Sequence, residues 1–446
     1  MFQNYLKTAL RNLLRYKGFA IINILSLTIG IIGCTVIGLF VWDEKQYDKN
    51  IPGGENIYRI YEERKDNENT TFNAAVPPMY TTFLQQQYPE VDTATRIMML
   101  GDKYLLEVGD KRSYETKGVF VDPSIFRFFS LKFTSGDPAT ALAAPNTIVL
   151  SQELATRYFG KEDPVGKTVF VNKDTFEVKG VMAPLPDHFH LDFAYLMPIS
   201  AVGIDPQRMQ NWTWHQFFSY VKLKPKADVQ MLQDKFQAHI RKEIFPTLTQ
   251  EGSTFMPYFQ PLKDIHLKSA DFGYDNAIRG NESYVNGLTI IALFVLLIAC
   301  FNFINLATAR SLRRAKEIGV RKVVGADRKQ LIIQFIGETI LLSVISMLIA
   351  IVATWLIVPA LNAFTEKAIQ FNPITNPVLT ASMLLAGIVV GILAGMYPAM
   401  VLSGFQPIKV LKNMKLTGSA GSSWLRPALV VVQFSLSVLL IIATLV

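Results

Sequence analysis

The sequence predicts an α-helical transmembrane bundle of four spans plus the start of a fifth, with a large α+β extracytoplasmic domain between spans 1 and 2. Three observations support this fold class. The chain is 50% hydrophobic and only 18% charged, whereas about 25% charged residues is usual for a soluble domain. Its apolar residues gather in five long runs without charge, and its cations gather in the segments between those runs.

Each apolar run is long enough to cross a bilayer as a helix, since about 20 residues suffice. The expected spans are 19–42, 285–309, 331–363 and 378–403, and a fifth begins at 427–446. A buried helix in a soluble core is the alternative for one run, but five runs argue against it. A cleaved signal peptide does not fit the first run, because its apolar core exceeds the roughly 7–15 residues of such a peptide.

Basic segments orient the spans. Residues 1–18 carry four cations and no acid, and their apolar residues recur at helical spacing, which predicts a cytoplasmic amphipathic interfacial helix. Residues 310–330 carry eight cations against two acids, and 402–426 carry four cations and no acid. Because cationic loops stay in the cytoplasm, residues 43–284 are expected outside it. The net charge of +8 therefore comes from cations in the segments expected in the cytoplasm, and no nucleic-acid partner is expected.

Residues 43–284 read as a mixed domain. Alternating or β-branched patterns predict strands at 57–61, 168–171 and 175–181. Helical patterns appear at 79–88, 151–159 and 228–244.

Two motifs in this domain resemble a phosphate-binding loop and a metal site. We reject the first reading and do not favour the second. Gly160 and Gly166 nearly match a phosphate-binding loop, but five residues separate them instead of four and a strand follows; we predict a turn into a strand. The stretch 187–192 contains Asp187, His188, His190 and Asp192, which are metal-ligating residue types, but a polar strand edge is favoured. No catalytic, cofactor-binding or metal-binding residue is assigned, and the chain is not expected to be an enzyme.

Residues 311–325 predict a short helix in the cytoplasm. Glu317 is spaced to pair with Arg313 and Arg321 at i,i+4. Gly325 suits the end of this helix, and Asp327 can cap the next one. Four apolar side chains lie among these charges and need a protein partner or the membrane interface: Ile318, Val320, Val323 and Val324.

The spans contain small residues and one acid. Glu338 is expected to make an interhelical hydrogen bond or to snorkel near the cytoplasmic face, which is favoured over a direct coupling role. Tyr397 and Pro398 are expected to kink the end of span 4. Close helix contacts are expected at glycines of span 1 (Gly30, Gly33, Gly38) and of span 4 (Gly387, Gly391, Gly395).

Several motifs carry a family resemblance. The run from Arg313 to Ala326, with Glu-Ile-Gly-Val-Arg-Lys at its centre, resembles the coupling segment of FtsX-like ABC-transporter permeases. Tyr397-Pro398-Ala399 with the following 402–412 resembles the end of that family's last span. Residues 124–192 resemble a MacB-type periplasmic core domain. These motifs place a MacB-like core at 43–284, an FtsX-like permease domain at 285–404 and a cytoplasmic linker at 405–426.

The resemblance implies a permease subunit that couples ATP hydrolysis on a separate cytoplasmic ABC ATPase to movement of the periplasmic domain. The outcome would be export or extraction of an amphiphilic drug, peptide or lipoprotein. The alternatives are a transmitter that regulates a cell-envelope hydrolase, or an antimicrobial-peptide sensing or resistance permease. This chain would bind no cofactor, since ATP and magnesium belong to the ATPase.

The resemblance also implies residue roles and partners. Implied partners are the ATPase, the bacterial inner membrane, a second permease half in a homodimer or pseudo-dimer, and a periplasmic adaptor with an outer-membrane channel. Residues 424–435 resemble the start of a second repeat, so a two-repeat protein cut after its first repeat is expected. Implied ATPase-coupling residues are Arg313, Arg314, Lys316, Glu317, Ile318, Gly319, Val320, Arg321, Lys322 and Gly325, with Glu338, Tyr397 and Pro398 as coupling or kink positions within the spans.

Overall fold

The computed structural model contains two compact units. One joins Met1–Asp43 to Ser283–Val446, and the other is Glu44–Glu282. The residues that the structure describes are 11, 17–65, 69–99, 103–247, 254–313, 320, 322–324, 327–403 and 425–445. The predicted interfacial helix at 1–18 and the linker at 405–426 therefore lie almost entirely outside the described residues.

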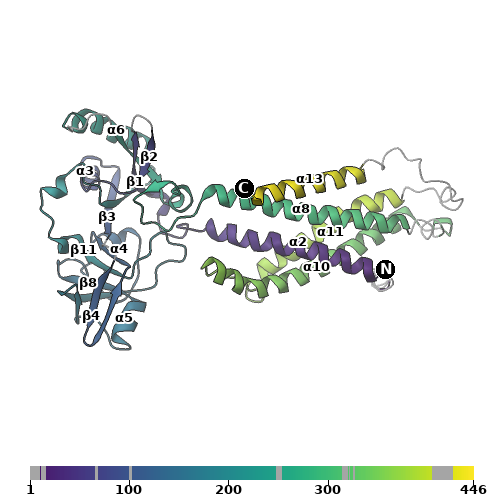
Figure 1. Cartoon of the computed structure of the whole chain (residues 1–446), viewed down its shortest axis with the longest axis horizontal. Coiled ribbons are helices and arrows are strands. Elements are labelled where there is room, and N and C mark those ends of the chain that lie inside the picture. Colours follow the sequence, from purple (N-terminus) through teal and green to yellow (C-terminus); the bar gives the residue numbers. More distant parts are fainter. Residues whose placement is uncertain are drawn as a thin grey trace. The chain divides into compact units, whose positions relative to one another are not determined.

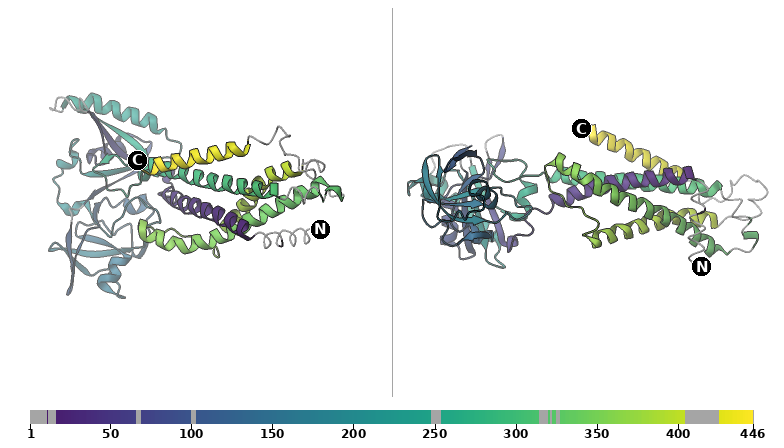
Figure 2. Two further views of the ribbon diagram at one scale, coloured as in Figure 1. Left: turned by 45° about the vertical axis from the view of Figure 1, so that its right-hand side comes forward. Right: turned by 90° about the horizontal axis from the view of Figure 1, so that it is seen from below.

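The first unit is helical. In Figures 1 and 2, α2, α8, α10 and α11 run lengthwise beside one another. These four helices are long and apolar enough to cross a membrane, and α13 contributes the shorter apolar stretch Pro427–Ala443. The described helices of this unit are α2 (Lys17–Glu44), α8 (Glu282–Arg313), α10 (Arg328–Thr365), α11 (Pro377–Ser403) and α13 (Leu425–Leu445).

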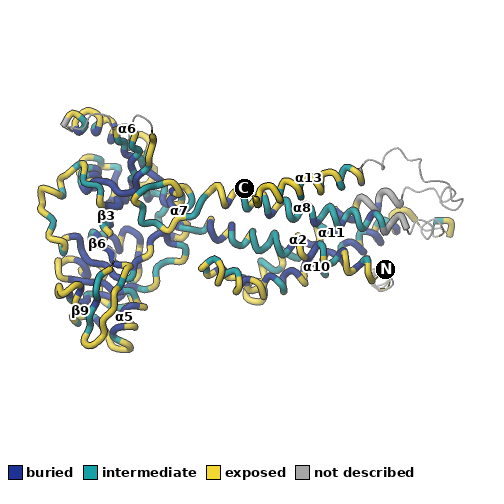
Figure 3. The backbone as a smooth tube through the Cα atoms, in the orientation of Figure 1, coloured by how far each residue is buried: buried dark blue, intermediate teal, exposed yellow. Residues whose placement is uncertain are grey.

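The helical unit is apolar both inside and outside. Leu27 of α2, Phe303 of α8 and Ala350 of α10 are fully buried in a shared core. Large side chains such as Leu293 and Leu356 point outward and are more than half exposed, as the yellow stretches along the helices in Figure 3 illustrate. A soluble bundle would place polar residues on that outer face. An apolar outer surface is what a bilayer requires.

Small polar residues join the helices inside this core. The Thr28 hydroxyl on α2 donates to the Ser346 carbonyl on α10 at 3.3 Å, and the Ser346 hydroxyl donates to the Ile24 carbonyl at 3.3 Å. The Ser343 hydroxyl donates to the Gly387 carbonyl of α11 at 2.7 Å. Such bonds satisfy hydroxyl groups that lipid could not, so α10 is tied to both α2 and α11.

The second unit is built on one fourteen-stranded sheet, ordered β14-β2-β1-β12-β3-β6-β11-β8-β10-β9-β4-β5, with β13 beside β1 and β7 beside β10. Most neighbouring pairs are antiparallel, while β8–β10, β6–β11 and β2–β14 are parallel. Its strands are β1 (Ile57–Lys65), β2 (Thr70–Asn73), β3 (Val91–Met99), β4 (Tyr104–Val108), β5 (Lys111–Glu115), β6 (Gly118–Val121), β7 (Phe133–Gly136), β8 (Thr147–Ser151), β9 (Thr168–Val171), β10 (Asp174–Met182), β11 (Tyr195–Pro198), β12 (Phe217–Leu223), β13 (Thr254–Pro261) and β14 (Phe272–Gly273).

Short helices pack on this sheet around separate apolar clusters. One cluster lies around Phe126 and Phe129, a second around Leu154 and Val178, and a third around Phe236. The described helices of this unit are α3 (Met79–Gln87), α4 (Ile125–Phe128), α5 (Gln152–Phe159), α6 (Val229–His239) and α7 (Ile265–Lys268). The predicted strands and helices of the domain are confirmed, because each overlaps an observed element of its type.

The predicted turn at residues 160–168 is also confirmed. Gly160 ends α5 with a φ of +67°, and Gly166 precedes β9 with a φ of +84°. Glycine adopts such left-handed angles without a steric cost. The two glycines therefore serve chain reversal, and a strand follows them in place of the helix that a phosphate-binding loop needs.

Candidate functional site

The predicted coupling segment is described only in part. Arg313 is the last residue of α8. Val320, Lys322, Val323 and Val324 are described, and the Val324 amide donates to the Val320 carbonyl at 3.1 Å, as in a helical turn. The predicted coupling residues Arg314, Lys316, Glu317, Ile318, Gly319, Arg321 and Gly325 lie outside the described residues.

The described part of this segment exposes apolar side chains beside a cation. Val320, Val323 and Val324 are 51%, 64% and 81% exposed. Partial burial lowers the pKa of Lys322, and the positive charge of Arg328 lowers it further. Exposed apolar groups rimmed by charge are typical of protein-binding surfaces. The arrangement suits docking of another protein against this turn.

Asp327 is the N-cap residue of α10, as the sequence predicts. Among the described residues, however, its side chain makes no capping hydrogen bond. Its carbonyl instead accepts from the Leu331 amide at 3.3 Å.

Glu338 is a buried acid on α10. Its side chain is buried and accepts a hydrogen bond from the Gln334 amide at 3.3 Å, one turn earlier on α10. Nearby on the same helix, Leu331 and Phe335 form a buried cluster with Ala399 of α11. Helix α11 continues through Tyr397 and Pro398 to Ser403, while the side chains of those two residues lie outside the described part. Glu338 is thus held inside the bundle.

The glycines of α11 allow very close contact with α10, as predicted. A Cβ at Gly391 would lie 2.6 Å from the Cα of Ile340, and one at Gly395 would lie 2.1 Å from the hydroxyl of Thr339. Both distances are shorter than two atoms can approach, so only glycine fits. The two helices therefore pack in close contact at these glycines.

Helix α2 approaches α8 in the same way at one glycine. A Cβ at Gly30 would lie 2.2 Å from the Cβ of Ala299, and one at Gly33 would lie 3.4 Å from Val295. The expectation for Gly38 is wrong, because a Cβ there would meet nothing within 4 Å in the described structure. The α2–α8 contact is therefore concentrated near the middle of the helices.

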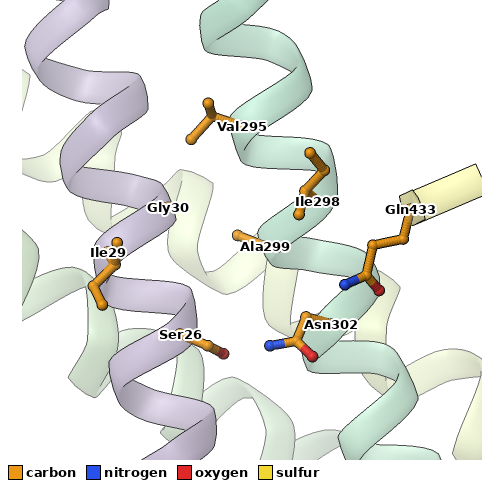
Figure 4. Close-up of a pocket in the computed structure, with 8 residues that line it drawn as sticks. All are labelled: Ser26, Ile29, Gly30, Val295, Ile298, Ala299, Asn302 and Gln433. Atoms are coloured by element: carbon orange, nitrogen blue, oxygen red, sulfur yellow. The ribbon is translucent and has the colours of Figure 1, made fainter. Parts of the chain in front are cut away.

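A groove of about 230 Å³ lies beside this contact, between α2, α8 and α13. Figure 4 shows Ser26, Asn302 and Gln433 turned toward the same space, with Ile29 and Val295 on its apolar walls. The Asn305 amide on α8 donates to Gln433 at 3.4 Å, and the Asn305 side-chain oxygen is buried with no partner among the residues that the structure describes. Polar groups in an apolar span need partners, so this face suits an amphiphile or another helix.

The outer end of α2 carries two adjacent acids with different partners. Asp43 belongs to the helical unit and pairs with Lys367, at 2.7 Å, in the turn after α10. Both of these side chains are mostly buried, at 6% and 15% exposure. Sequence reasoning missed this pair, although an acid directly after an apolar run and a cation in the 364–377 loop were visible.

Glu44 belongs to the sheet unit and pairs with His266. Its carboxylate lies 3.0 Å from His266 Nε2, and His266 Nδ1 bonds the Ile278 carbonyl at 2.7 Å. The Tyr47 ring stacks on the His266 ring at 3.5 Å. A Cβ at Gly280 would lie 2.4 Å from the Glu44 carboxylate. The chain leaving α2 and the chain leading to α8 are therefore clasped together within this unit.

A second buried histidine holds the same segment. His190 Nδ1 lies 2.8 Å from the Asp48 carboxylate and Nε2 lies 3.0 Å from the Tyr220 hydroxyl, with Asp48 and His190 side chains fully buried. Asp192 pairs with Lys117. Among the described residues, no group of three metal-ligating side chains is placed to hold an ion. The expectation of a polar strand edge at 187–192 is wrong, because these residues lie in the connection between β10 and β11 and His190 is fully buried there. His190 acts as a structural anchor.

Family models match both units of the chain. A model described as MacB-like periplasmic core domain matches residues 20–239, and one described as FtsX-like permease C-terminal matches residues 289–407. The chain is an ABC transporter permease of the MacB/FtsX family. It is a multi-pass membrane protein with a periplasmic domain.

Known proteins are similar to parts of this chain or to most of it. The macrolide export ATP-binding/permease protein MacB of Bdellovibrio bacteriovorus is 24% identical over 59% of this chain, and the match spans only 38% of that protein. The ABC transporter permease YknZ of Bacillus subtilis is 23% identical over 91% of this chain and 98% of its own length. The crystal structure of the periplasmic region of MacB from Actinobacillus actinomycetemcomitans aligns with 47% of this chain and 92% of its own, at 18% identity and a TM-score of 0.33.

Proposed function

We propose that this permease transmits movement from a cytoplasmic ABC ATPase to its periplasmic domain, so that an amphiphilic substrate is exported or extracted. The observation that carries the proposal is the double anchoring of the end of α2. Asp43 is paired within the helical unit and the adjacent Glu44 within the periplasmic unit. A displacement of α2 therefore acts directly on the segment that both pairs hold.

The cytoplasmic end supports an ATPase partner. Val320, Val323 and Val324 expose apolar surface beside Lys322, in a segment with many cations. We assign the ATPase-docking role to this segment, and we propose a bacterial inner-membrane location with the N-terminus of the chain in the cytoplasm. Under this proposal, ATP and magnesium are bound by the partner ATPase.

The groove beside α13 supports a further partner within the membrane. Its apolar walls and the polar side chains of Ser26, Asn302 and Gln433 fit a second permease half, so we propose a homodimer or pseudo-dimer. A periplasmic adaptor with an outer-membrane channel completes the export hypothesis. A transmitter that regulates an envelope hydrolase uses the same movement without a substrate, and would lack substrate-stimulated ATP hydrolysis.

Charge reversal tests the coupling segment. The double variant Arg321→Glu/Lys322→Glu is expected to abolish stimulation of the co-purified ATPase in nanodiscs, because opposite charge disrupts a docked basic surface. Membrane insertion and thermal unfolding should not change. The matched control reverses two exposed periplasmic lysines, Lys161→Glu/Lys263→Glu, and should retain full stimulation. If the Arg321→Glu/Lys322→Glu variant stimulates the ATPase as fully as the control variant does, this segment does not couple to the ATPase.

A further inference from the structure

Helices α2 and α10 end at the same level on the outer side of the helical unit. Near the middle of the bundle, the Thr28 hydroxyl of α2 bonds the Ser346 carbonyl of α10. At the outer end, Asp43 of α2 pairs with Lys367, which directly follows α10. The two helices therefore run in the same direction and reach this end together.

Exposed aromatic rings mark the same level on three helices. The contact of Gly30 with Ala299 places the start of the antiparallel α8 beside the end of α2. Trp42 of α2, Tyr284 of α8 and Phe364 of α10 are each more than half exposed. Aromatic side chains gather where a bilayer meets water. The level of these rings therefore corresponds to the outer surface of the bilayer.

Helix α11 begins well short of this level. A Cβ at Gly387 of α11 would lie 3.2 Å from the Cβ of Met347 on α10, which fixes the antiparallel register of the two helices. In this register Val378, in the first turn of α11, lies level with Leu356 of α10. Helix α10 continues to Thr365, about 14 Å further outward. The chain that connects α10 to α11 therefore descends by that distance along the bundle.

This connection, residues 366–376, is fixed against the side of the bundle. Ile369 and Phe371 are buried, and Phe371 belongs to the apolar core of the helices. The Asn362 side chain of α10 donates to the Ile369 carbonyl and accepts from the Ile369 amide, both at 3.0 Å. The connection carries no charged residue after Lys367, unlike most loops that lie in water. Its position beside the helices is therefore built into the fold.

The lower part of the connection exposes both apolar and polar groups. Ile374 is 80% exposed, and Val378 just beyond it is 78% exposed. Between and before them, the polar residues Asn372, Thr375 and Asn376 are exposed as well. Irregular backbone with polar side chains does not face lipid within the hydrocarbon region. A flat bilayer that reached the aromatic rings would place this segment about 14 Å inside it.

We propose that the outer leaflet is locally thinned beside α11, so that phospholipid headgroups and their water reach down to residues 366–376. A span shorter than its neighbours is accommodated in this way at modest cost. Ile374 and Val378 then lie where headgroups meet acyl chains, and the exposed amides contact headgroups. Lipid occupies this surface because it continues the apolar outer face of the bundle. The thinned leaflet goes beyond the proposed transmission and does not depend on an ATPase.

The test compares two positions at the same level of the bundle, Leu356 and Val378. Each is replaced by cysteine in a full chain lacking Cys34 and Cys300, spin-labelled and placed in phosphatidylcholine nanodiscs. Collisions with oxygen and with nickel(II) ethylenediaminediacetate measure the depth of the label below the local lipid surface. The label at Leu356 should lie about 12 Å deep, which is the rise of α10 from Leu356 to Phe364. The label at Val378 should lie at the surface.

A third label, at Phe364, separates the alternatives and should also lie at the surface. If Leu356 and Val378 are equally deep, the bilayer is flat and extends to the aromatic rings. If both lie at the surface and Phe364 lies in water, the helices protrude from a flat bilayer. If Val378 is shielded from both reagents, protein covers it in place of lipid. Each of these three results would overturn the proposal.

Lysine substitutions give a second readout that uses no label. Leu356→Lys places a cation among acyl chains and should lower the thermal unfolding temperature in nanodiscs by several degrees. Ile374→Lys, the matched variant, places the same cation among headgroups and should unfold like the wild type. Equal effects of the two substitutions would contradict the thinned leaflet. ATP hydrolysis is not measured in either experiment, so a failure of the transmission proposal leaves these results intact.

Discussion

Two adjacent acidic residues at the outer end of α2 have different partners. Asp43 and Glu44 are neighbours in sequence, yet one pairs with Lys367 and the other with His266. A partly buried pair stabilises modestly by itself, but removing one partner leaves an uncompensated charge. Each of these two acids therefore holds the end of α2 to a side chain that is distant in sequence.

Neutralising Asp43 should destabilise the fold, whereas exchanging the charges of Asp43 and Lys367 should destabilise it less. Asp43→Asn is expected to destabilise the protein by about 3 kcal/mol, since it leaves the cation of Lys367 in a mostly buried place. Thermal unfolding of the chain in nanodiscs measures the loss. The exchanged pair Asp43→Lys/Lys367→Asp should recover at least half of it. If the single variant unfolds at the wild-type temperature, the pair has no structural role.

Helix packing in the membrane unit depends on positions where no side chain fits. Gly30 on α2 touches Ala299 on α8, and Gly391 on α11 lies against the backbone of α10. Lipid provides no hydrophobic driving force between helices, so close contact and small polar bonds supply the association. The α10–α11 pair and the α2–α8 contact thus behave as stiff elements.

A methyl group at the α2–α8 contact should be destabilising. Gly30→Ala forces the two helices apart and is expected to cost roughly 1–3 kcal/mol, as overpacking does. Gly38→Ala, on the same helix, meets no neighbour within 4 Å and should be neutral or slightly stabilising. The double variant Gly30→Ala/Ala299→Gly restores the space and should recover the loss in a thermal unfolding series. Similar effects of the two single alanine variants would argue against the close contact.

The whole molecule combines an apolar bundle with a fourteen-stranded periplasmic unit. The two are joined by the end of α2 and the start of α8, and within the periplasmic unit these connections are clasped by Glu44, His266 and Gly280. Under the proposed function, force enters at the cytoplasmic segment and leaves through this clasp. Removing the Glu44–His266 pair should therefore leave ATP hydrolysis intact but stop the movement of the periplasmic unit.

That separation can be measured with the ATPase partner bound. Spin labels at Thr375 and Lys226, in a background lacking Cys34 and Cys300, report the distance between the two units. In the wild type, trapping the ATPase with vanadate should shift the distance distribution. Glu44→Gln is expected to abolish this shift while ATP hydrolysis continues at the wild-type rate. The control Glu55→Gln changes an exposed acid of the same unit and should keep the shift. Retention of the shift in Glu44→Gln would show that force does not pass through the clasp.

Much of the architecture could be read from the chain alone. Long apolar runs predicted the spans, because a helix that crosses the hydrocarbon core of a bilayer must be apolar on its outside. Period-two patterns at 168–171 and 175–181 predicted strands that match β9 and β10. Gly391 and Gly395 revealed a close helix contact through their spacing. Such features are local, and the physics that decides them acts over a few residues.

Long-range partners were decided only by the tertiary structure. Glu44 and His266 are separated by most of the periplasmic domain, as are Asp48 and His190, and no spacing rule links them. Gly38 looked like Gly30 in sequence but faces no neighbour among the described residues, because helix rotation sets which face meets a partner. The sequence by itself thus determined span, strand and turn, whereas pairing and packing across the fold depended on three-dimensional proximity.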